Sequence, residues 1–337
     1  MNTRYKPIKL ADLAKKLKVS KVTISKALRN HPDISPAMIK KVKDLADKMG
    51  YMPNSLARNL SSRKSNTIGL VVPKIAHIFF ASVIESIYNE AFQNNYEIIL
   101  TVSQEQAERE KKHILSLMAM RVDGIIISVT EHTKDVGIFK KVKDLGVPLL
   151  FFDRVPSISN TSSITCDDRG GAFEAVEYAV RKGYTKIAHL GGYHYINIGK
   201  SRYEGFKDAM NKFKIPINKN WVTQGGFGEE DGYYGFMRMY RKGDLPQYIL
   251  AVTYPVALGM RNAAASMGIK IPGDIEVTCF GKSMFVKQLP SFFNFVDQPT
   301  KEMGQDAIQT MLQMINNPKN FRAKNIKLKT ELVITQN

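Results

Sequence analysis

The sequence predicts a small all-α helix-turn-helix headpiece followed by an α/β core of two doubly wound, parallel-sheet lobes. Three observations predict this organisation. Helical periodicity with a tight turn occupies the start of the chain, positive charge is concentrated in the same stretch, and apolar strands alternate with amphipathic helices over the rest. A chain of 337 residues is also long enough for two lobes in addition to a headpiece.

The stretch from residue 8 to residue 29 contains two short helices joined by a turn. The first has one apolar face, formed by Leu10, Leu13, Ala14 and Leu17. Ser20 is a good N-cap for the second, whose inward stripe is Ile24, Ala27 and Leu28. The side chains left on its outer surface are Lys21, Val22, Thr23, Ser25, Lys26 and Arg29. Such a helix can enter the major groove of DNA, where its N-terminal residues meet base edges.

The alternative for this stretch is a solvated basic helix in an ordinary three-helix bundle. The distribution of charge favours DNA. Residues 1–64 hold 16 Lys or Arg and 4 Asp or Glu, an excess of 12 out of a net charge of +18 for the whole chain. A local excess of this size indicates a polyanionic partner.

A third helix completes the headpiece. Its start is marked by Ser35 and Pro36, its apolar stripe runs from Ile39 to Met49, and Gly50 follows its end. Pro53 and Asn54 then signal another helix start, with room for about two turns over residues 54–61 before the first strand. A helix this short is marginal alone in water, so we expect it to form only when it packs against something.

The rest of the chain alternates strands such as TIGLVV, EIILTV and DGIIISV with amphipathic helices, and a second series follows from SITCD to EVTCFG. This alternation is typical of βαβ units and parallel sheets. Ligands of such sheets bind at the carboxyl ends of the strands, so the cleft between the two lobes is the expected pocket.

Several classes of protein are disfavoured. Residues 1–30 lack the apolar core of a secretory signal, and no run is long enough to span a membrane, so we expect a cytoplasmic protein, associated with the nucleoid. Cys166 and Cys279 lie in apolar strand contexts, as expected of small buried residues. The six His residues show no metal-binding spacing, and no cofactor is expected. An enzyme is also disfavoured: GGYHYINIGKS has His194 where a phosphate loop needs glycine, and GGFGEEDG has Asp231 where a dinucleotide fingerprint needs its third glycine.

Six segments follow one another along the chain: LADLAKKLKVSKVTISKALR, GYMPNSLARNL, SNTIGLVVP, FFDR, SRYEGF and QPTKEMG. In this order and spacing they resemble the lactose-repressor (LacI/GalR) family of bacterial transcription regulators. The resemblance implies that Lys21, Val22 and Lys26 face bases. It also implies that Ser20, Thr23, Ser25 and Arg29 mostly hold the DNA backbone. Lys18 departs from the family, which usually has glycine in this turn.

The resemblance also implies a hinge helix that pairs with its copy in a dimer. In that dimer, Leu60 would enter a central base step of the operator from the minor groove. Asn54, at the start of the same segment, is also expected to bind DNA. An apolar wedge of this kind unstacks and kinks the duplex at a cost of a few kcal/mol, which new contacts offset. The alternative is that Leu60 is an ordinary linker residue.

For the core, the resemblance implies the fold of periplasmic sugar-binding proteins, with the chain crossing between lobes near residues 165, 295 and 320. Arg202 would be the cationic anchor of the effector cleft, and Asp153 would face it from the other lobe. Phe80, Phe227 and Gln298 would complete the walls. An aromatic ring and a charged group together suit the apolar faces and hydroxyls of a sugar. The alternative for Arg202 is a salt bridge between lobes.

Two departures bear on the effector. Where many sugar-responsive members have Asn-Asp after YILAV, this chain has Thr253 and Tyr254, and where they have Asp after EVTCF it has Gly281 and then Lys282. Each lost hydrogen bond to a buried polar group can cost about 1–3 kcal/mol, so a free hexose is disfavoured. Lys282 beside Arg202 could suit an anionic ligand such as a sugar phosphate or a uronate. Equally, Lys282 could point to solvent.

The sequence therefore predicts a DNA-binding transcriptional regulator, with repression expected. Two copies would bind double-stranded DNA at a pseudo-palindromic operator, under control of a sugar or sugar derivative. The expected domains are a headpiece (1–53), a hinge (54–65), an N-lobe (66–165 with 296–319) and a C-lobe (166–295 with 320–337). Two alternatives remain: a regulator whose core answers to a protein partner in place of a small ligand, and a plain solute-binding module. The basic headpiece argues against the second.

Overall fold

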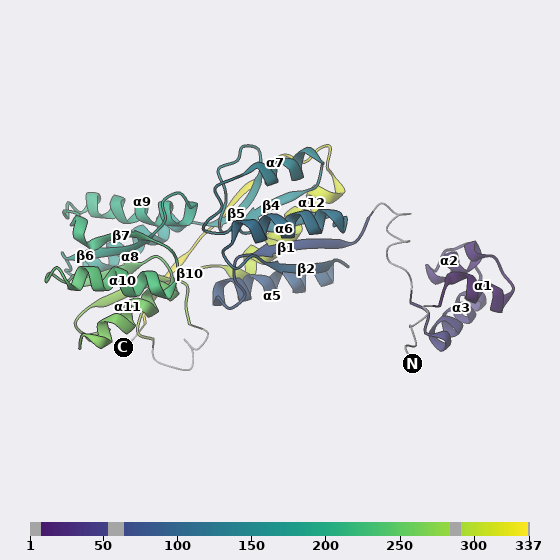
Figure 1. Ribbon diagram of the computed structural model, residues 1–337, viewed down its shortest axis with the longest axis horizontal. Helices are drawn as coiled ribbons and strands as arrows, with labels where there is room; N and C mark the ends of the chain where they lie inside the picture. The colour runs from purple at the N-terminus through teal and green to yellow at the C-terminus, as the bar shows by residue number, and fades with distance from the viewer. Residues whose placement is uncertain (1–7, 53–63, 284–290, 336–337) are drawn as a thin grey trace. The chain divides into compact units, whose positions relative to one another are not determined.

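The computed structural model describes residues 8–52, 64–283 and 291–335 (Figure 1). The chain divides into two compact units, residues 1–65 and residues 66–337. The predicted hinge helix, with Asn54 and Leu60, lies outside the described residues. The prediction of a helical headpiece followed by two α/β lobes is confirmed.

The first unit holds α1 (Leu10–Leu17), α2 (Lys21–Leu28) and α3 (Pro36–Met49). Their shared core consists of the buried residues Leu13, Ala14, Ile24, Ala27, Val42 and Ala46. Both predicted N-caps form, since the Ser20 hydroxyl accepts from the Thr23 amide at 3.0 Å and the Ser35 hydroxyl accepts from the Met38 amide at 3.4 Å. Lys18 adopts the left-handed conformation with φ 54°, which costs a non-glycine residue roughly 1–2 kcal/mol.

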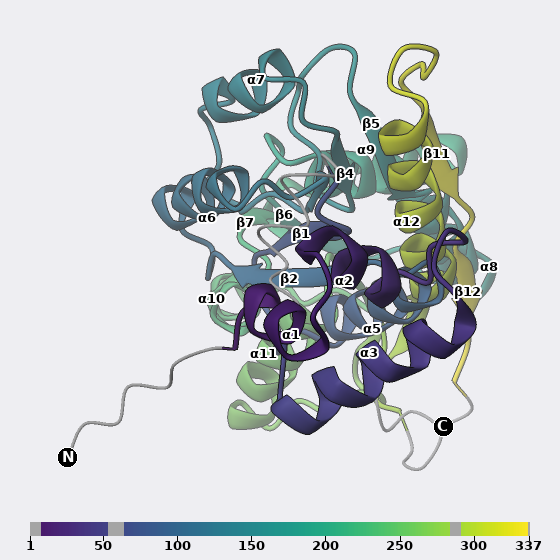
Figure 2. The same ribbon diagram turned by 90° about the vertical axis from the view of Figure 1, so that its right-hand side faces the viewer.

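The N-lobe is built on a six-stranded parallel sheet in the order β11-β5-β4-β3-β1-β2. The strands are β1 (Thr67–Val72), β2 (Glu97–Val102), β3 (Gly124–Ile127), β4 (Leu149–Phe152), β5 (Ser162–Cys166) and β11 (Asn325–Leu328). The helices of this lobe are α5 (Ile78–Gln93), α6 (Ala107–Ala119), α7 (Gly137–Asp144) and α12 (Thr300–Asn316). α5 and α12 contribute to one buried apolar cluster and α6 and α7 to another, on opposite sides of the sheet (Figure 2).

The C-lobe repeats this architecture with the order β12-β10-β9-β8-β6-β7. Its strands are β6 (Ile187–Gly192), β7 (Val222–Gly225), β8 (Tyr248–Ala251), β9 (Glu276–Phe280), β10 (Asn294–Asp297) and β12 (Glu331–Val333). α8 (Asp168–Arg181) and α9 (Asn197–Lys212) share one buried cluster, and α10 (Glu229–Tyr240) and α11 (Tyr254–Ser266) share another. A short 3-10 helix, η1 (Lys219–Trp221), precedes β7. The sequence predicts a wholly parallel sheet here. This is wrong for one strand, because β12 runs antiparallel to β10.

The chain passes between the lobes three times, and the predicted C-lobe boundary at residue 320 is wrong. β11 pairs with β5 in the N-lobe sheet, so the last passage lies at residues 329–330, between β11 and β12. Sequence alone could not separate these two short strands, because only their pairing partners assign them to different sheets. The second passage falls between β10 and α12, which leaves Val296 and Asp297 in the C-lobe sheet.

Candidate functional sites

The outer surface of α2 carries the side chains that the sequence predicts. Ile24 and Ala27 are fully buried, while Val22 is 64% exposed. Ser20, Lys21 and Arg29 are exposed, and Thr23, Ser25 and Lys26 are partly exposed. A 64% exposed valine on a basic helix is suited to contact with a thymine methyl group.

Most polar groups on this surface also have partners inside the headpiece. The hydroxyls of Ser20 and Thr23 lie 2.8 Å apart. Arg29 donates to the Ser25 hydroxyl at 3.2 Å and to its carbonyl oxygen at 3.1 Å. Lys26 Nζ lies 2.6 Å from Asp33 Oδ2, and this pair lowers the pKa of Asp33. Among the described residues, Lys21 and Val22 have no side-chain partner of this kind, so they are the groups most available to a ligand.

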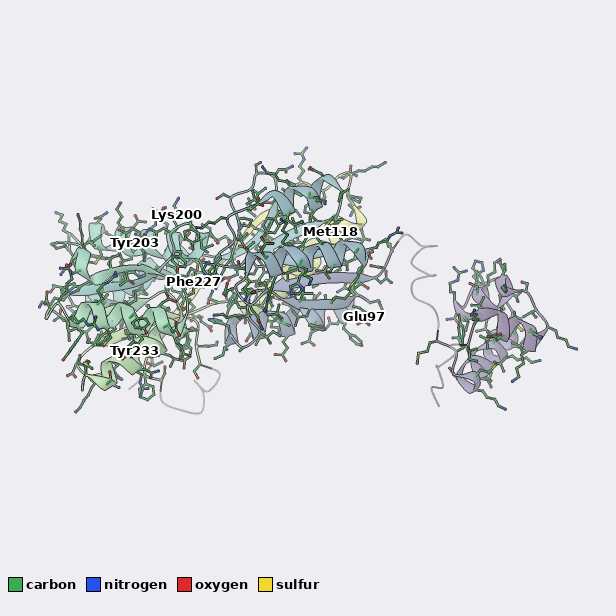
Figure 3. The ribbon with its side chains drawn as sticks, in the orientation of Figure 1. Glu97, Met118, Lys200, Tyr203, Phe227 and Tyr233 are labelled. Atoms are coloured by element: carbon green, nitrogen blue, oxygen red, sulfur yellow. The ribbon has the colours of Figure 1, made fainter. Side chains whose placement is uncertain are left out.

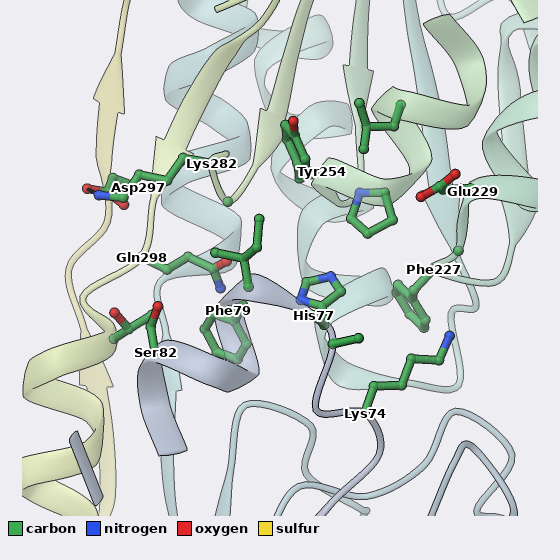
Figure 4. A pocket seen from close by; sticks show the side chains of 17 residues that line it. Lys74, His77, Phe79, Ser82, Phe227, Glu229, Tyr254, Lys282, Asp297 and Gln298 are labelled. Atoms are coloured by element: carbon green, nitrogen blue, oxygen red, sulfur yellow. Dashed lines mark hydrogen bonds and ion pairs between the residues drawn. The ribbon is translucent and has the colours of Figure 1, made fainter. Parts of the chain in front are cut away.

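A second site lies between the two lobes of the core, as a cavity of about 420 Å³ (Figure 4). The segment after β1 and the first turns of α5 contribute its N-lobe side, from Lys74 to Ser82. Its C-lobe side comes from segments that follow β7, β8, β9 and β10. The cavity therefore sits at the carboxyl ends of parallel strands, where such sheets bind ligands, and its volume falls within the usual range for small molecules.

Four of the eight predicted effector residues line this cavity: Phe227, Gly281, Lys282 and Gln298. Phe227 lies where the C-lobe meets the N-lobe (Figure 3). Gly281 has φ +83°, a left-handed conformation that favours glycine. The Lys282 Nζ lies 2.6 Å from Asp297 Oδ2.

The other four, Phe80, Asp153, Arg202 and Thr253, are buried beside the cavity and do not line it. Arg202 Nε and Nη2 donate to Asp168 Oδ1 at 2.8 and 2.6 Å, and Nη1 donates to the Val252 carbonyl oxygen at 2.5 Å. Asp168 begins α8 of the same lobe, so this ion pair lies within the C-lobe and does not join the two lobes. The Thr253 hydroxyl donates to the Phe227 carbonyl oxygen at 2.9 Å and accepts from the Val256 amide at 3.3 Å.

Asp153 has its carboxyl group buried and its backbone in the left-handed region at φ 56°. Burial raises the pKa of this carboxyl to about 6, although the nearby guanidinium groups of Arg154 and Arg202 oppose the rise. Its carbonyl oxygen accepts from Asn197 Nδ2 at 2.8 Å, and Asn197 Oδ1 accepts from the Val155 amide at 2.9 Å. The Asn197 side chain therefore joins the C-lobe to the backbone of the N-lobe through two hydrogen bonds.

Sequence reasoning missed three further residues: Arg154, its partner Glu105, and His77. Arg154 pairs with Glu105 at 3.0 Å, and its guanidinium lies 4.8 Å from the ring centre of Phe227 across the junction. His77, immediately before α5, lines the cavity. Burial lowers the pKa of His77 to about 4, and within the described residues its buried Nδ1 has no hydrogen-bond partner. A lone His or Arg in a loop gives no periodic signal, so the sequence offers no means to find these residues.

Cys166 and Cys279 are buried, as predicted. Within the ranges that the structure describes, no three His, Cys, Asp or Glu side chains gather as a metal site would need. Over the same ranges, none of the helices has the length and apolar character required to cross a membrane.

The sequence matches two family profiles. One, described as bacterial regulatory proteins of the lacI family, covers residues 9–54. The other, described as periplasmic binding proteins and sugar binding domain of the LacI family, covers residues 65–335.

Similar proteins of full length include catabolite control protein A of Priestia megaterium, 27% identical over 92% of this chain and 93% of that one. The NTD biosynthesis operon regulator NtdR of Bacillus subtilis is 28% identical over 96% and 98%. The transcriptional repressor PurR of Pasteurella multocida is 27% identical over 96% and 97%. The lac repressor dimer bound to operator has a similar fold, with a TM-score of 0.85 at 24% identity over 98% of each chain.

Proposed function

Since the chain belongs to the LacI family of bacterial regulatory proteins, we propose that it represses transcription as a homodimer on a pseudo-palindromic operator. A small effector in the interlobe cavity sets the affinity for DNA. The observation that carries this proposal is the outward surface of α2, where exposed Lys21 and Val22 stand on a helix held by a packed three-helix core. One headpiece reads too few bases for a specific site, and two-fold symmetry doubles the number.

The contacts with DNA divide by chemistry. Lys21, Val22 and Lys26 face base edges, and Ser20, Thr23, Ser25 and Arg29 hold phosphates and sugars. Leu60, with Asn54 in the same segment, enters the central step of the operator from the minor groove. The sequence NSLARNL between headpiece and first strand supports this role, although it lies outside the described residues.

The effector acts by changing how the two lobes meet. Both lobes contribute side chains to the cavity, and β1, the first strand of the N-lobe, follows the hinge segment in the chain. A ligand that favours one arrangement of the lobes then favours one arrangement of the two hinge segments in the dimer. The coupling is reciprocal, so the operator changes effector affinity by the same factor.

Two neighbouring proposals complete the assignment. The chain acts in the cytoplasm, on the nucleoid, because its ligand is operator DNA. We also propose no enzymatic activity. In support, the stretch that most resembles a phosphate loop, GGYHYINIGKS, has His194 where glycine is needed, and its Asn197 bonds to the N-lobe backbone.

A second candidate function is a regulator whose core answers to a protein partner. The observation that favours it is that two predicted effector contacts already have partners within the protein, since Arg202 bonds to Asp168 and Thr253 bonds to Phe227. A plain solute-binding module is opposed by the basic headpiece.

Selection of bound sequences from a random DNA pool, with purified full-length protein at near-physiological salt, tests the proposed function. A two-fold symmetric motif is the expected result. Enrichment without symmetry, or no enrichment, contradicts a dimeric operator-binding repressor. Salt dependence gives a second test, because a headpiece that contacts phosphates requires a clearly negative slope of log affinity against log salt concentration.

A further inference from the structure

The interlobe cavity is lined mainly by apolar side chains from both lobes. Ile78 and Phe79 belong to the N-lobe, and Phe227, Pro255 and Leu258 belong to the C-lobe. The ring of Tyr254 also reaches the cavity (Figure 4). Burial of such a surface contributes most to the free energy of binding when the ligand is aromatic or otherwise apolar.

The charged side chains that line the cavity sum to zero. Lys282 is paired with Asp297, and Lys74 from the N-lobe and Glu229 from the C-lobe carry opposite signs (Figure 4). Arg202, behind the cavity wall, is neutralised by Asp168. An anionic ligand would therefore have to compete with Asp297 for Lys282 and with Asp168 for Arg202.

The groups that would read the hydroxyls of a sugar are also engaged. Arg202, Thr253 and Asn197 each make at least two hydrogen bonds within the protein. A hexose carries several hydroxyls, and each one buried without a partner costs about 1–3 kcal/mol.

Five neutral polar side chains line the cavity: His77, Gln298 and the hydroxyl-bearing Ser82, Tyr254 and Thr300. His77 Nδ1 is buried with no partner among the described residues, and Gln298 Nε2 has only a weak contact with Cys166 Sγ at 3.8 Å. A neutral imidazole offers one donor and one acceptor, and a carboxamide offers two N–H donors and an acceptor oxygen. His77 and Gln298 together can therefore bond to donors and acceptors at the edge of one ring.

We propose that the effector is an uncharged molecule with an aromatic body, which contacts Phe227, Tyr254 and Leu258 and bonds at its edge to His77 and Gln298. This inference rests on the proposed function, because it names the chemical class of ligand for the same cavity. Gly281 contributes by leaving space: a Cβ placed there meets only Gln298 Oε1 at 3.7 Å and Tyr254 Cβ at 4.0 Å.

Direct titration of the full-length protein tests the ligand class, with indole and 2-naphthol as neutral aromatic probes. D-glucose, D-glucuronate and glucose 6-phosphate serve as polar probes. We expect saturable binding of at least one aromatic probe and none of the three sugars. Binding of any of these sugars without an aromatic probe, or failure of both aromatic probes to bind, overturns the proposal.

Two variants locate the binding. Gly281→Asn adds a carboxamide at a left-handed position that asparagine tolerates, and Leu258→Asn makes the wall polar. Each should weaken binding of the aromatic probe about tenfold or more, a loss of about 1.4 kcal/mol or more. Leu115→Asn is the matched control, because Leu115 lies on α6 and is 39% exposed. Equal affinity in Gly281→Asn and the native protein overturns the proposal even if Leu258→Asn fails to fold.

Operator affinity, measured in the same samples, separates this proposal from the proposed function. If a sugar binds and changes operator affinity, the aromatic ligand class is wrong and the regulator stands. If the protein selects no symmetric operator, the regulator itself is wrong, whatever the cavity binds.

Discussion

Arg202 and Asp168 form a buried ion pair in which Nε and Nη2 both donate to one carboxylate oxygen, at 2.8 and 2.6 Å. The two side chains are 2% and 4% exposed. The guanidinium also lies 3.9 Å from the ring centre of Phe280. From this arrangement we infer that Arg202 stabilises the C-lobe, whereas the family resemblance implies an effector anchor.

Replacing Arg202 with alanine should therefore destabilise the core. Asp168 would remain buried without its cation, which costs about 3–5 kcal/mol of the free energy of unfolding. Urea unfolding measures this loss. Arg169→Ala is the control, because Arg169 and Asp208 also lie 2.6 Å apart but are 58% and 38% exposed, and its loss should change stability little. An Arg202→Ala protein of native stability that has lost its effector response would restore the anchor role.

The pairing of Lys26 with Asp33 predicts that Asp33 restrains DNA binding. Lys26 must leave this partner, or share it, before it meets bases or phosphates. Asp33→Asn should raise operator affinity roughly two- to fivefold, the range typical of an exposed ion pair, and should make the salt dependence steeper. Asp47→Asn, an exposed change of equal charge on α3, is the control. If operator affinity rises equally in the two variants, the cause is the change in net charge and not the release of Lys26.

The ionisation of Glu110, a residue that is 1% exposed, should make the stability of the protein depend on pH. Its carboxylate accepts from the Thr130 amide and the Thr133 hydroxyl, each at 2.8 Å, but burial dominates and raises its pKa from 4.5 to about 7. The folded protein thus holds this proton more tightly than the unfolded chain. The stability that results is fully present below pH 4.5 and is lost as the pH rises through 7.

Glu110→Gln removes this titration. Between pH 4.5 and pH 7 the free energy of unfolding of the native protein should fall relative to that of the variant, by an amount on the order of 1–3 kcal/mol. Urea unfolding over this pH range gives the comparison. Parallel pH profiles for the two proteins would mean that Glu110 does not titrate in the window.

Leu60→Ala tests the hinge. Loss of the apolar wedge should weaken specific operator binding by a few kcal/mol at most and reduce the central bend of the DNA, while effector binding persists. Gel mobility of operator fragments with the site at different positions measures the bend. Unchanged affinity together with an unchanged bend would leave Leu60 as an ordinary linker residue.

Local patterns in the sequence were enough for much of the fold. The caps at Ser20 and Ser35 and the apolar stripes of α1 to α3 depend on neighbours within a few residues, and they form as predicted. The left-handed Lys18 also follows from local geometry. By contrast, β11 and β12 have nearly the same length and surroundings in the sequence, and only their pairing with β5 and β10 assigns them to different lobes.

The candidate sites divide in the same way. The sequence by itself determined which side chains α2 presents outward, because helical periodicity fixes the face of every residue once the apolar stripe is known. It also determined that a pocket opens at the carboxyl ends of the strands. Only the tertiary structure decided that Asp168 forms an ion pair with Arg202, that Asp297 forms one with Lys282, and that apolar side chains from both lobes line the cavity. These pairings join residues far apart in the chain, and a buried charge takes whichever opposite charge the packing brings nearest.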